Sequence, residues 1–253
     1  MVVHLADANP APHLVTPTVV QGGLHDWSVG AKWVHEWDYG VNFALPLPSF
    51  QPYALLHDAA TDPDGLPMNG QVLFVGNTGL FQVGNYSEDA IMSFDGTATH
   101  DLIRFPHDKT RGAENIGTDG LDMVWTLGEN RPVNQPVYPT RSIYTSPYTT
   151  ESTKLAPRRL RSDPSAEFGL EEAQFAVGCG FAGRVISATD NVEIVRLSDG
   201  VGWILQGTKD WKWIEVLGFT CDEAIVEAIP TVPGTFALAR VKLDSLGTAL
   251  PPD

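Results

Sequence analysis

Short strand-like segments that end in an aspartate recur along this chain, and this recurrence limits the possible folds more than any other feature. The segments read "HLADAN", "ALLHDAA", "IRFPHDKT", "RLRSDPS", "VRLSDGV" and "VKLDSLG". Their acidic residues are Asp7, Asp58, Asp108, Asp163, Asp199 and Asp244. The intervals between them are near the ~40–50 residues that one blade of a β-propeller occupies. The recurrence therefore indicates a chain built from repeated units of similar size.

The segments between these aspartates have the character of β-strands. The chain's 24 glycines and 19 prolines separate short runs that are rich in Val, Ile, Trp, Phe and Thr, as is typical of many short strands. In "AKWVHEWDYG" the residues alternate, so Trp33, His35 and Trp37 are predicted to share one face. One short helix is expected over residues 165–173, where "SAEFGLEEA" offers a capping serine. The predicted fold class is all-β.

A β-propeller with five blades is the architecture that the repeat favours, in a single domain over residues 1–253. Six markers enclose five intervals, and the pattern of Val3, Leu5 and Asp7 repeats that of residues 195–199. We therefore expect an N-terminal closing strand, in which residues 2–5 pair with a C-terminal strand and leave no sheet edge open. The alternative is a β-sandwich, in which similar strand ends arise from common turn chemistry.

The composition excludes several classes of partner. With 31 acidic and 16 basic residues the formal net charge is −15, which repels nucleic acid and anionic lipid surfaces. No apolar run approaches the ~20 residues that a membrane-spanning helix needs. Hydrophobic residues make up 43% of the chain, enough for a large core. We expect a monomer without membrane insertion, and no cofactor.

The segment from "IGTDGLDMVWTLGE" to "ARVKLDSLG", about residues 116–247, resembles the propeller domains of bacterial extracytoplasmic proteins and lipoproteins, including myxobacterial ones. This resemblance implies a β-propeller in a secreted, cell-surface or periplasmic protein, with a leader segment that is absent from the sequence. It implies no assigned activity and no functional residue.

The strongest candidate binding site is the aromatic cluster "HDWSVGAKWVHEWDYG", residues 25–40. Tryptophan rings stack on sugar faces and nearby carboxylates accept hydrogen bonds from hydroxyl groups, as a glycan site requires. The candidate ligand-binding residues are Asp26, Trp27, Trp33, Glu36 and Trp37. The alternative role of these rings is packing between neighbouring sheets. We expect Trp27 to be more exposed than Trp33 or Trp37.

The predicted function is a non-catalytic binding module that recognises a glycan or a protein partner through loops at one mouth of the propeller. The alternative is a five-bladed glycoside hydrolase, which needs two carboxylates roughly 5 to 9.5 Å apart. Its candidate acids are Asp26, Asp122 and Glu223. The recurring aspartates are expected to accept hydrogen bonds from turn amides, and thus to be structural.

Two further features bear on metal and redox chemistry. The string "TDPDG", with Asp62 and Asp64, is a fragment of a calcium loop but lacks the later ligands, so no metal site is predicted. Cys179 and Cys221 are the only cysteines. Aligning their Gly-Phe neighbours places them four positions out of register, which predicts two buried free thiols rather than a disulfide.

Overall fold

The computed structural model of this chain consists of β-strands and two short 3-10 helices within the part it describes. The described residues are 2–3, 12–13, 27–29, 32–38, 41–49, 52–85, 87–105, 110–130, 140–162, 175–186, 191–207, 211–230 and 237–252, and the side chains of some of these are left undescribed. The helix expected over residues 165–173 lies outside them.

Strands that follow one another in sequence also lie side by side in each sheet, all antiparallel. The first sheet contains β3 (Trp27–Val29), β4 (Trp33–Asp38), β5 (Val41–Pro46) and β6 (Ala54–Asp58). The second contains β7 (Met68–Val75), β8 (Thr78–Asn85), β9 (Ser87–Phe94) and β10 (Thr99–Arg104). The third contains β11 (Gly112–Thr118), β12 (Asp122–Glu129), β13 (Thr140–Pro147) and β14 (Arg158–Ser162).

The last two sheets differ in size. The fourth contains β15 (Ala176–Gly178), β16 (Phe181–Ile186), β17 (Asn191–Arg196) and β18 (Gly202–Leu205). Among the described residues the fifth has three strands, β19 (Trp211–Phe219), β20 (Glu223–Pro230) and β21 (Ala237–Lys242). The 3-10 helices are η1 (Ser152–Lys154) and η2 (Leu243–Ser245). Outside these sheets, β1 (Val2–Val3) pairs with β2 (Pro12–His13).

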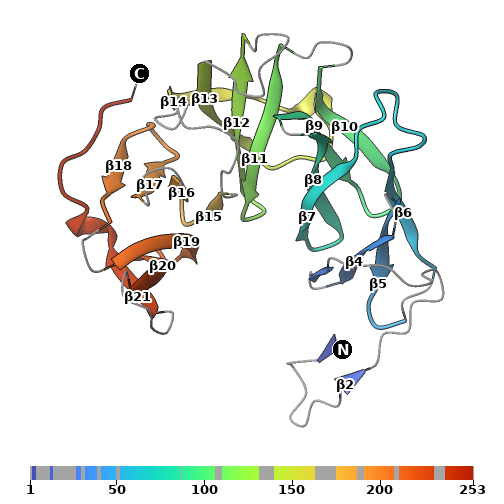
Figure 1. The fold of residues 1–253 in the computed structure, drawn as a ribbon, viewed down its shortest axis with the longest axis horizontal. Helices are drawn as coiled ribbons and strands as arrows, with labels where there is room; N and C mark the ends of the chain where they lie inside the picture. Colours follow the sequence, from blue (N-terminus) through green and yellow to red (C-terminus); the bar gives the residue numbers. More distant parts are fainter. Residues whose placement is uncertain are drawn as a thin grey trace.

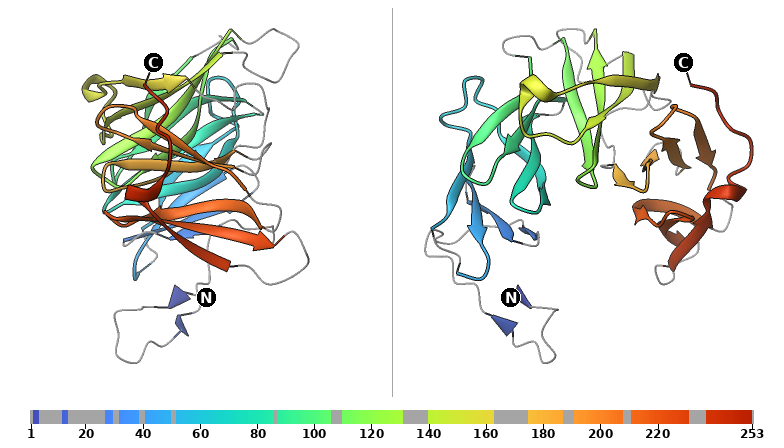
Figure 2. Two further views of the ribbon diagram at one scale, coloured as in Figure 1. Left: turned by 90° about the vertical axis from the view of Figure 1, so that its left-hand side faces the viewer. Right: turned by 180° about the vertical axis from the view of Figure 1, so that it is seen from behind.

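The five sheets follow one another around an arc, with the first and fifth sheets at its two ends (Figure 1). The first strands of neighbouring sheets contact each other where β11 meets β15 and β15 meets β19. Seen from behind, the sheets follow the same order along the arc (Figure 2, right). The fold is a β-propeller, so the sandwich alternative is excluded.

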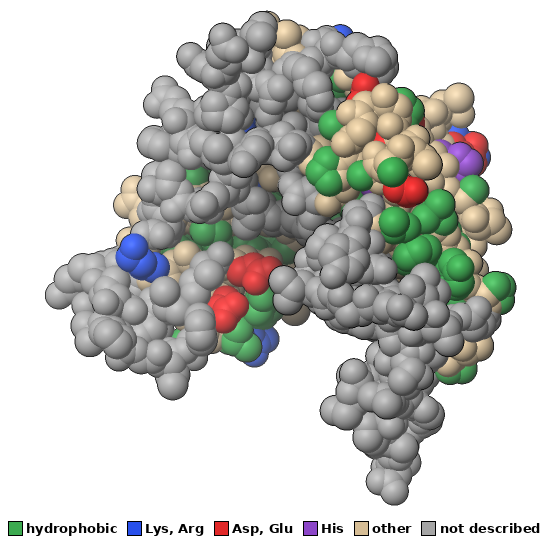
Figure 3. Space-filling view, turned by 45° about the vertical axis from the view of Figure 1, so that its right-hand side comes forward, with side chains coloured by type: hydrophobic (Ala, Val, Ile, Leu, Met, Phe, Trp, Pro, Cys, Tyr) green, Lys and Arg blue, Asp and Glu red, His purple; other side chains and the backbone are tan. Residues whose placement is uncertain are grey.

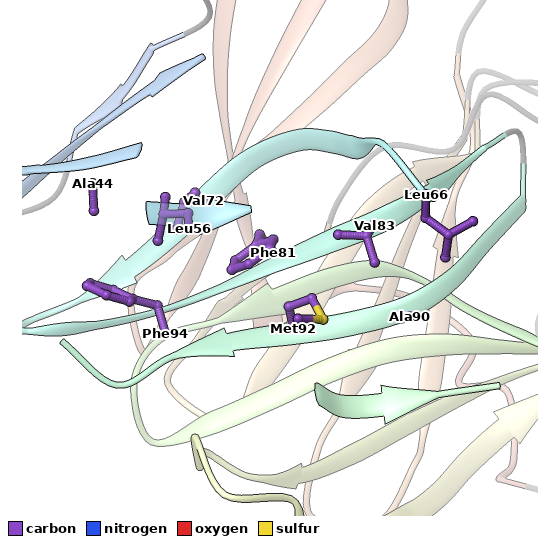
Figure 4. Close-up of a cluster of buried hydrophobic side chains, with 9 residues drawn as sticks. All are labelled: Ala44, Leu56, Leu66, Val72, Phe81, Val83, Ala90, Met92 and Phe94. Carbon is purple, nitrogen blue, oxygen red and sulfur yellow. The ribbon is translucent and has the colours of Figure 1, made fainter. Parts of the chain in front are cut away.

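The core is divided into clusters that each lie between two neighbouring sheets. The cluster between the first and second sheets is shown in Figure 4, where Phe81 and Phe94 lie among aliphatic side chains. The strands alternate, so one set of side chains faces one neighbouring sheet and the other set faces the next. On β8, for example, Phe81 packs toward the first sheet, while Leu80 packs toward the third. The period-two pattern thus determines which neighbouring sheet each strand residue contacts.

Between the third and fourth sheets the buried layer is partly ionic. Arg184 and Glu193 are fully buried and lie opposite each other on β16 and β17, with a closest N–O distance of 3.4 Å. Arg161, on β14 of the third sheet, reaches the same carboxylate at 3.5 Å. Removing one member of a buried ion pair leaves an uncompensated charge. Arg161, Arg184 and Glu193 therefore act together in stabilising the contact between the third and fourth sheets.

The N-terminal pairing expected from the sequence was wrong. Val2 and Val3 lie opposite His13 and Pro12, so β1 pairs with its near neighbour in sequence and not with a C-terminal strand. Local pairing closes a short loop, and a short loop loses less conformational entropy than one that spans the whole chain. In the part of the chain that the structure describes, β21 therefore has one strand neighbour, β20.

The recurring aspartates also lie at different places in their sheets. Asp58 ends a fourth strand, whereas Asp199 lies in the turn between a third and a fourth strand. For these two aspartates the expected role is confirmed, because Asp58 accepts a hydrogen bond from the amide of Ala60 and Asp199 from that of Val201. Asp244 lies in the 3-10 helix η2. Asp7, Asp108 and Asp163 lie outside the described residues. The repeat predicted the kind of unit correctly, but it did not predict which strand of the unit each aspartate follows.

Candidate functional site

The aromatic cluster predicted from the sequence is divided by the fold. Trp33 lies at the start of β4, where its ring Nε1 donates to the carbonyl of Asn77 at 3.2 Å. Its ring meets that of Phe94 edge-on, with centroids 5.2 Å apart, and packs against the cluster between the first two sheets. These contacts join the first sheet to the second. Trp33 thus packs between neighbouring sheets, which was the alternative to ligand binding for this residue.

The other members of that cluster lie along the rest of the first sheet. Strand register places Trp27 opposite Glu36 and Trp37 opposite Asn42. The structure describes only the backbone at Trp27, Glu36 and Trp37, and Asp26 lies outside the described residues. Their role in binding stays a prediction, as does the greater exposure of Trp27.

A second candidate site lies at one end of the third, fourth and fifth sheets, where the turns between first and second strands gather. These turns are residues 119–121, 179–180 and 220–222, and we call this surface the turn end. Cys179, in the second of these turns, forms a disulfide with Cys221, in the third, with Cα atoms 5.1 Å apart. The disulfide ties the three-stranded fifth sheet to the fourth.

The prediction of two free thiols is therefore corrected. The alignment that matched Phe181 with Phe219 shifted the repeat, since Phe181 begins a second strand and Phe219 ends a first strand. When the turns themselves are aligned, Cys179 and Cys221 occupy corresponding turns of neighbouring sheets, within disulfide reach. A turn-based alignment of the repeats would have found the bond.

Leu121 is the most exposed large hydrophobic side chain recorded in the described part of the chain, with 79% of its surface accessible. The turn that carries it is well fixed, because Asp119 Oδ1 accepts from the amides of both Leu121 and Asp122 at 2.9 Å. Gly120 has a φ of +88°, and a Cβ there would lie 2.7 Å from Val75 Cγ1. An apolar side chain held outward on a rigid turn is typical of a protein contact.

Beside this turn lies a hollow of about 460 Å³ between the third and fourth sheets. Asp122, Arg158, Arg196 and Ser198 supply its polar groups, and Cys179 forms part of its wall. Burial raises the pKa of the Asp122 carboxyl, and the nearby charge of Asp119 raises it further against the opposing effect of Arg158. The hollow can accept carboxylate or amide groups through its two guanidinium groups.

The two arginines of this hollow are held by different partners. Arg158 donates through Nη2 to the carbonyl of Leu197, and so links the third sheet to the fourth. Arg196 forms an ion pair with Asp199 at 2.7 Å, and its guanidinium carbon lies 5.7 Å from the ring centroid of Trp203. Arg196 is held in place by Asp199 and Trp203 and is partly exposed. It can therefore contact a ligand without a large rearrangement.

On the other side of the disulfide is a larger hollow of about 700 Å³ on the fifth sheet. It is lined by Cys221 and by charged residues of both signs, Asp222, Glu223, Arg240, Lys242 and Asp244. Arg240 is ion-paired with Glu223 across the sheet. The disulfide thus separates two polar hollows and holds the turns on either side of it in place.

The acids considered for a glycoside hydrolase do not come together in the described residues. Asp122 lines the smaller hollow and Glu223 the larger one, and Glu223 is engaged by Arg240. The third candidate, Asp26, is outside the described residues. Asp122 and Glu223 therefore line no common hollow in this part of the chain.

Asp62 and Asp64, the fragment of a calcium loop, contact an arginine. Arg104 approaches Asp62 at 2.8 Å and Asp64 at 3.1 Å, and all three side chains are buried. The guanidinium takes the place that a cation would need and connects the loop after β6 to β10. Over the described ranges, no group of three or more metal-ligating side chains occurs.

Comparison with known proteins gives the fold and no family. No protein-family profile and no curated protein matches the chain. A chain of the nidogen/laminin complex has 15% identity, a TM-score of 0.50, and coverage of 87% of this chain and 80% of that one. TolB from Agrobacterium tumefaciens has 11% identity, a TM-score of 0.48, and coverage of 90% and 80%.

A third similar structure is that of YCF48 bound to a D1 peptide, with 12% identity, a TM-score of 0.49, and coverage of 94% of this chain and 74% of that one. These neighbours are β-propellers. At such low identities the likeness extends to the fold alone, and among these three only the first reaches a TM-score of 0.5. None of the helices in the described ranges is long and apolar enough to cross a membrane.

Proposed function

We propose that this protein is a non-catalytic binding module that recognises a protein partner through the turn end of its third to fifth sheets. The observation that carries this proposal is Leu121, an apolar side chain 79% exposed. Its turn is held by three hydrogen bonds, from the amide of Gly120 to Thr118 Oγ1 and from the amides of Leu121 and Asp122 to Asp119 Oδ1. An exposed apolar anchor beside a polar hollow is the usual arrangement of a protein-binding surface.

The disulfide supports an extracytoplasmic location for this module. A bond between Cys179 and Cys221 persists in an oxidising compartment, such as the periplasm or the extracellular medium, and is rare in the cytosol. The resemblance of residues 116–247 to bacterial extracytoplasmic propellers points in the same direction. The net charge of −15 suits a protein that must stay soluble and avoid nucleic acid.

The test compares what three forms of the chain retain from the periplasmic and secreted fractions of the source organism. The forms are the wild type, Leu121→Asp, and Leu55→Asp as a matched control, since Leu55 is an exposed leucine of the first sheet. We expect a defined protein to bind the wild type and the control, and to bind Leu121→Asp at least ten-fold more weakly. Equal retention by all three forms would contradict the proposal.

A glycan site in the first sheet is the second candidate, and one observation favours it. Trp27 lies directly opposite Glu36 in the β3–β4 register, which brings an aromatic residue and an acid to neighbouring positions. A glycan array with the wild type and Trp27→Ala separates the two candidates. Glycans bound by the wild type and lost in Trp27→Ala would favour the first sheet over the turn end.

A further inference from the structure

The disulfide between Cys179 and Cys221 lies on the surface of the protein. Both cysteines are exposed, and each lies in the turn that joins the first strand of its sheet to the second. Structural disulfides of secreted proteins resist reduction, whereas exposed ones are the labile or regulatory ones. The two cysteines also line different hollows, Cys221 the larger one and Cys179 the smaller one. An external thiol can therefore reach this bond.

We propose that the bond is a site of thiol–disulfide exchange, at which a small zwitterionic thiol attaches to Cys221 and Cys179 leaves as a thiolate. The sulfur of the entering thiolate attacks Cys221 Sγ. A new S–S bond forms there while the bond between Cys221 and Cys179 breaks, and the electron pair of the broken bond leaves on Cys179 Sγ. One thiolate is consumed and one is produced, so the step needs no further oxidant or reductant.

The smaller hollow favours a thiolate on Cys179. Its charged lining consists of two cations, Arg158 and Arg196, and one acid, Asp122. Arg158 donates to the carbonyl of Leu197 and forms no ion pair with another described residue, so its charge is available to an anion. A thiolate is stabilised beside cations, and a more stable thiolate is a better leaving group.

The larger hollow has the opposite balance of charge. Cys221 lies there among three acids and two cations, and the exposed Asp222 follows it directly in sequence. A thiolate released on Cys221 would therefore be less stable than one released on Cys179. This difference sets the direction of the exchange, in which Cys221 is attacked and Cys179 leaves.

The larger hollow also has the groups to hold a zwitterion beside Cys221. Its volume of about 700 Å³ is in the range of small-molecule sites. Lys242 can pair with a carboxylate of the thiol and Asp244 with its ammonium group. Arg240 and Glu223 pair with each other, but Lys242 and Asp244 form no ion pair with another described residue. Charges of both signs are thus available to the entering thiol.

The two turns have contacts of their own that remain when the bond opens. Gly178 pairs with Phe181 across the first turn, and Phe219 pairs with Ala224 across the second. The rings of Phe181 and Phe219 stack between the two sheets, with centroids 6.1 Å apart. The two sulfurs therefore stay near each other after exchange, so that the released thiolate can expel the bound thiol and restore the native bond.

Trapping of the mixed disulfide in the wild type tests the direction of attack. The oxidised protein is incubated briefly with reduced glutathione, a zwitterionic thiol, and quenched with excess N-ethylmaleimide before peptide mapping by mass spectrometry. We expect glutathione on Cys221 and maleimide on Cys179, in about five-fold excess over the reverse product. Equal amounts of the two products, or an excess of the reverse one, would overturn the proposal.

Arg158→Met tests the stabilisation of the leaving thiolate. It should slow the opening of the native disulfide by glutathione by about three-fold or more. In a Cys179→Ser background, where Cys179 no longer leaves, the same substitution should not change the rate at which Cys221 reacts with glutathione disulfide. Equal slowing of both reactions would show that Arg158 acts only through the structure, and the direction would lose its basis.

Lys242→Met tests recognition of the zwitterion. In the Cys179→Ser background, the free Cys221 attacks glutathione disulfide and one glutathione leaves as the thiolate. Lys242→Met should slow this reaction about five-fold more than the reaction with hydroxyethyl disulfide, which carries no charge. Lys154→Met removes the same charge from an exposed lysine of η1 and should affect neither reaction. If Lys242→Met slows both disulfides equally, the larger hollow does not recognise a zwitterion and the proposal fails.

Discussion

The first and fifth sheets both end the arc of the propeller, yet they do so differently. The first sheet is complete, and its exposed residues near the outer strand, Tyr53 and Leu55, are apolar. Figure 3, which brings this side of the molecule forward, shows hydrophobic side chains gathered among the described residues there. In the described part of the chain the fifth sheet has three strands, and its last strand exposes Leu238, Arg240 and Lys242.

The two end sheets are also tied to the arc by different means. Packing of Trp33 and Leu56 against the second sheet holds the first sheet. The fifth sheet packs against the fourth as well, but a covalent bond between turns strengthens that contact. A sheet with fewer strands buries less surface of its own, so its stability depends more on a constraint from outside it.

The largest effect is expected from the disulfide. Replacing Cys179 and Cys221 by alanine frees a loop with a sequence separation of 42 residues in the unfolded chain. The chain-entropy estimate for this length is about 4 kcal/mol of lost unfolding free energy. Urea unfolding followed by circular dichroism measures it, and chemical reduction of the wild type should lower the midpoint by a similar amount. Equal midpoints for wild type and variant would remove the distinction between the two end sheets.

Next in size is the effect of Trp33→Ala on the first sheet. Loss of the ring removes the contact with Phe94 and the hydrogen bond to Asn77, and it leaves a cavity between two sheets. We expect unfolding free energy to fall by about 3 kcal/mol, somewhat less than for a fully buried tryptophan. A thermal melt of Trp33→Ala beside Leu121→Ala, which changes an exposed side chain, checks this. If the Trp33→Ala and Leu121→Ala variants melt at the same temperature, packing of Trp33 does not hold the first sheet.

A smaller and pH-dependent effect is expected at the link between the first and second sheets. Burial raises the pKa of Asp62, but hydrogen bonds from Arg104 and from the amides of Asp64 and Leu66 outweigh it and hold the pKa below the ordinary 3.8. A depressed pKa adds stability above the unfolded value, and this stability is lost as the pH falls through the folded value.

Arg104→Met should therefore lower unfolding free energy by about 2 kcal/mol at pH 7, because two buried carboxylates lose their partner. The difference from the wild type should shrink as the pH falls below about 4, where Asp62 becomes protonated in the variant and then in the wild type. Unfolding curves at pH 7, 5 and 3 give this dependence. A difference that grows toward acid pH would show the sign to be wrong.

Much of the fold could be predicted from the sequence, because strand alternation and repeat length depend on local chemistry. The phase of the repeat could not, since Asp58 and Asp199 make the same kind of turn at different points of their sheets. That error in phase also hid the disulfide, which depends on how turns from neighbouring sheets approach each other in space. The pattern of residues along the sequence does not reveal how closely the turns of Cys179 and Cys221 approach each other in the fold.

The candidate site was only partly predictable for a similar reason. Trp33 was singled out for its ring, and three-dimensional packing gives that ring a neighbour in another sheet. Leu121 stood in the sequence as one apolar residue in an ordinary "DGLD" turn, and its exposure follows from Asp119 and Gly120 holding the turn outward.

The first sheet is held to the second by packing, whereas the fifth sheet is held to the fourth by packing and by the disulfide between Cys179 and Cys221. Hydrogen exchange of the oxidised and the reduced protein, followed by mass spectrometry, tests this difference directly. After reduction the amides of β19 to β21 should exchange faster, while those of β4 to β6 should keep their protection. Equal protection of β19 to β21 before and after reduction would contradict it.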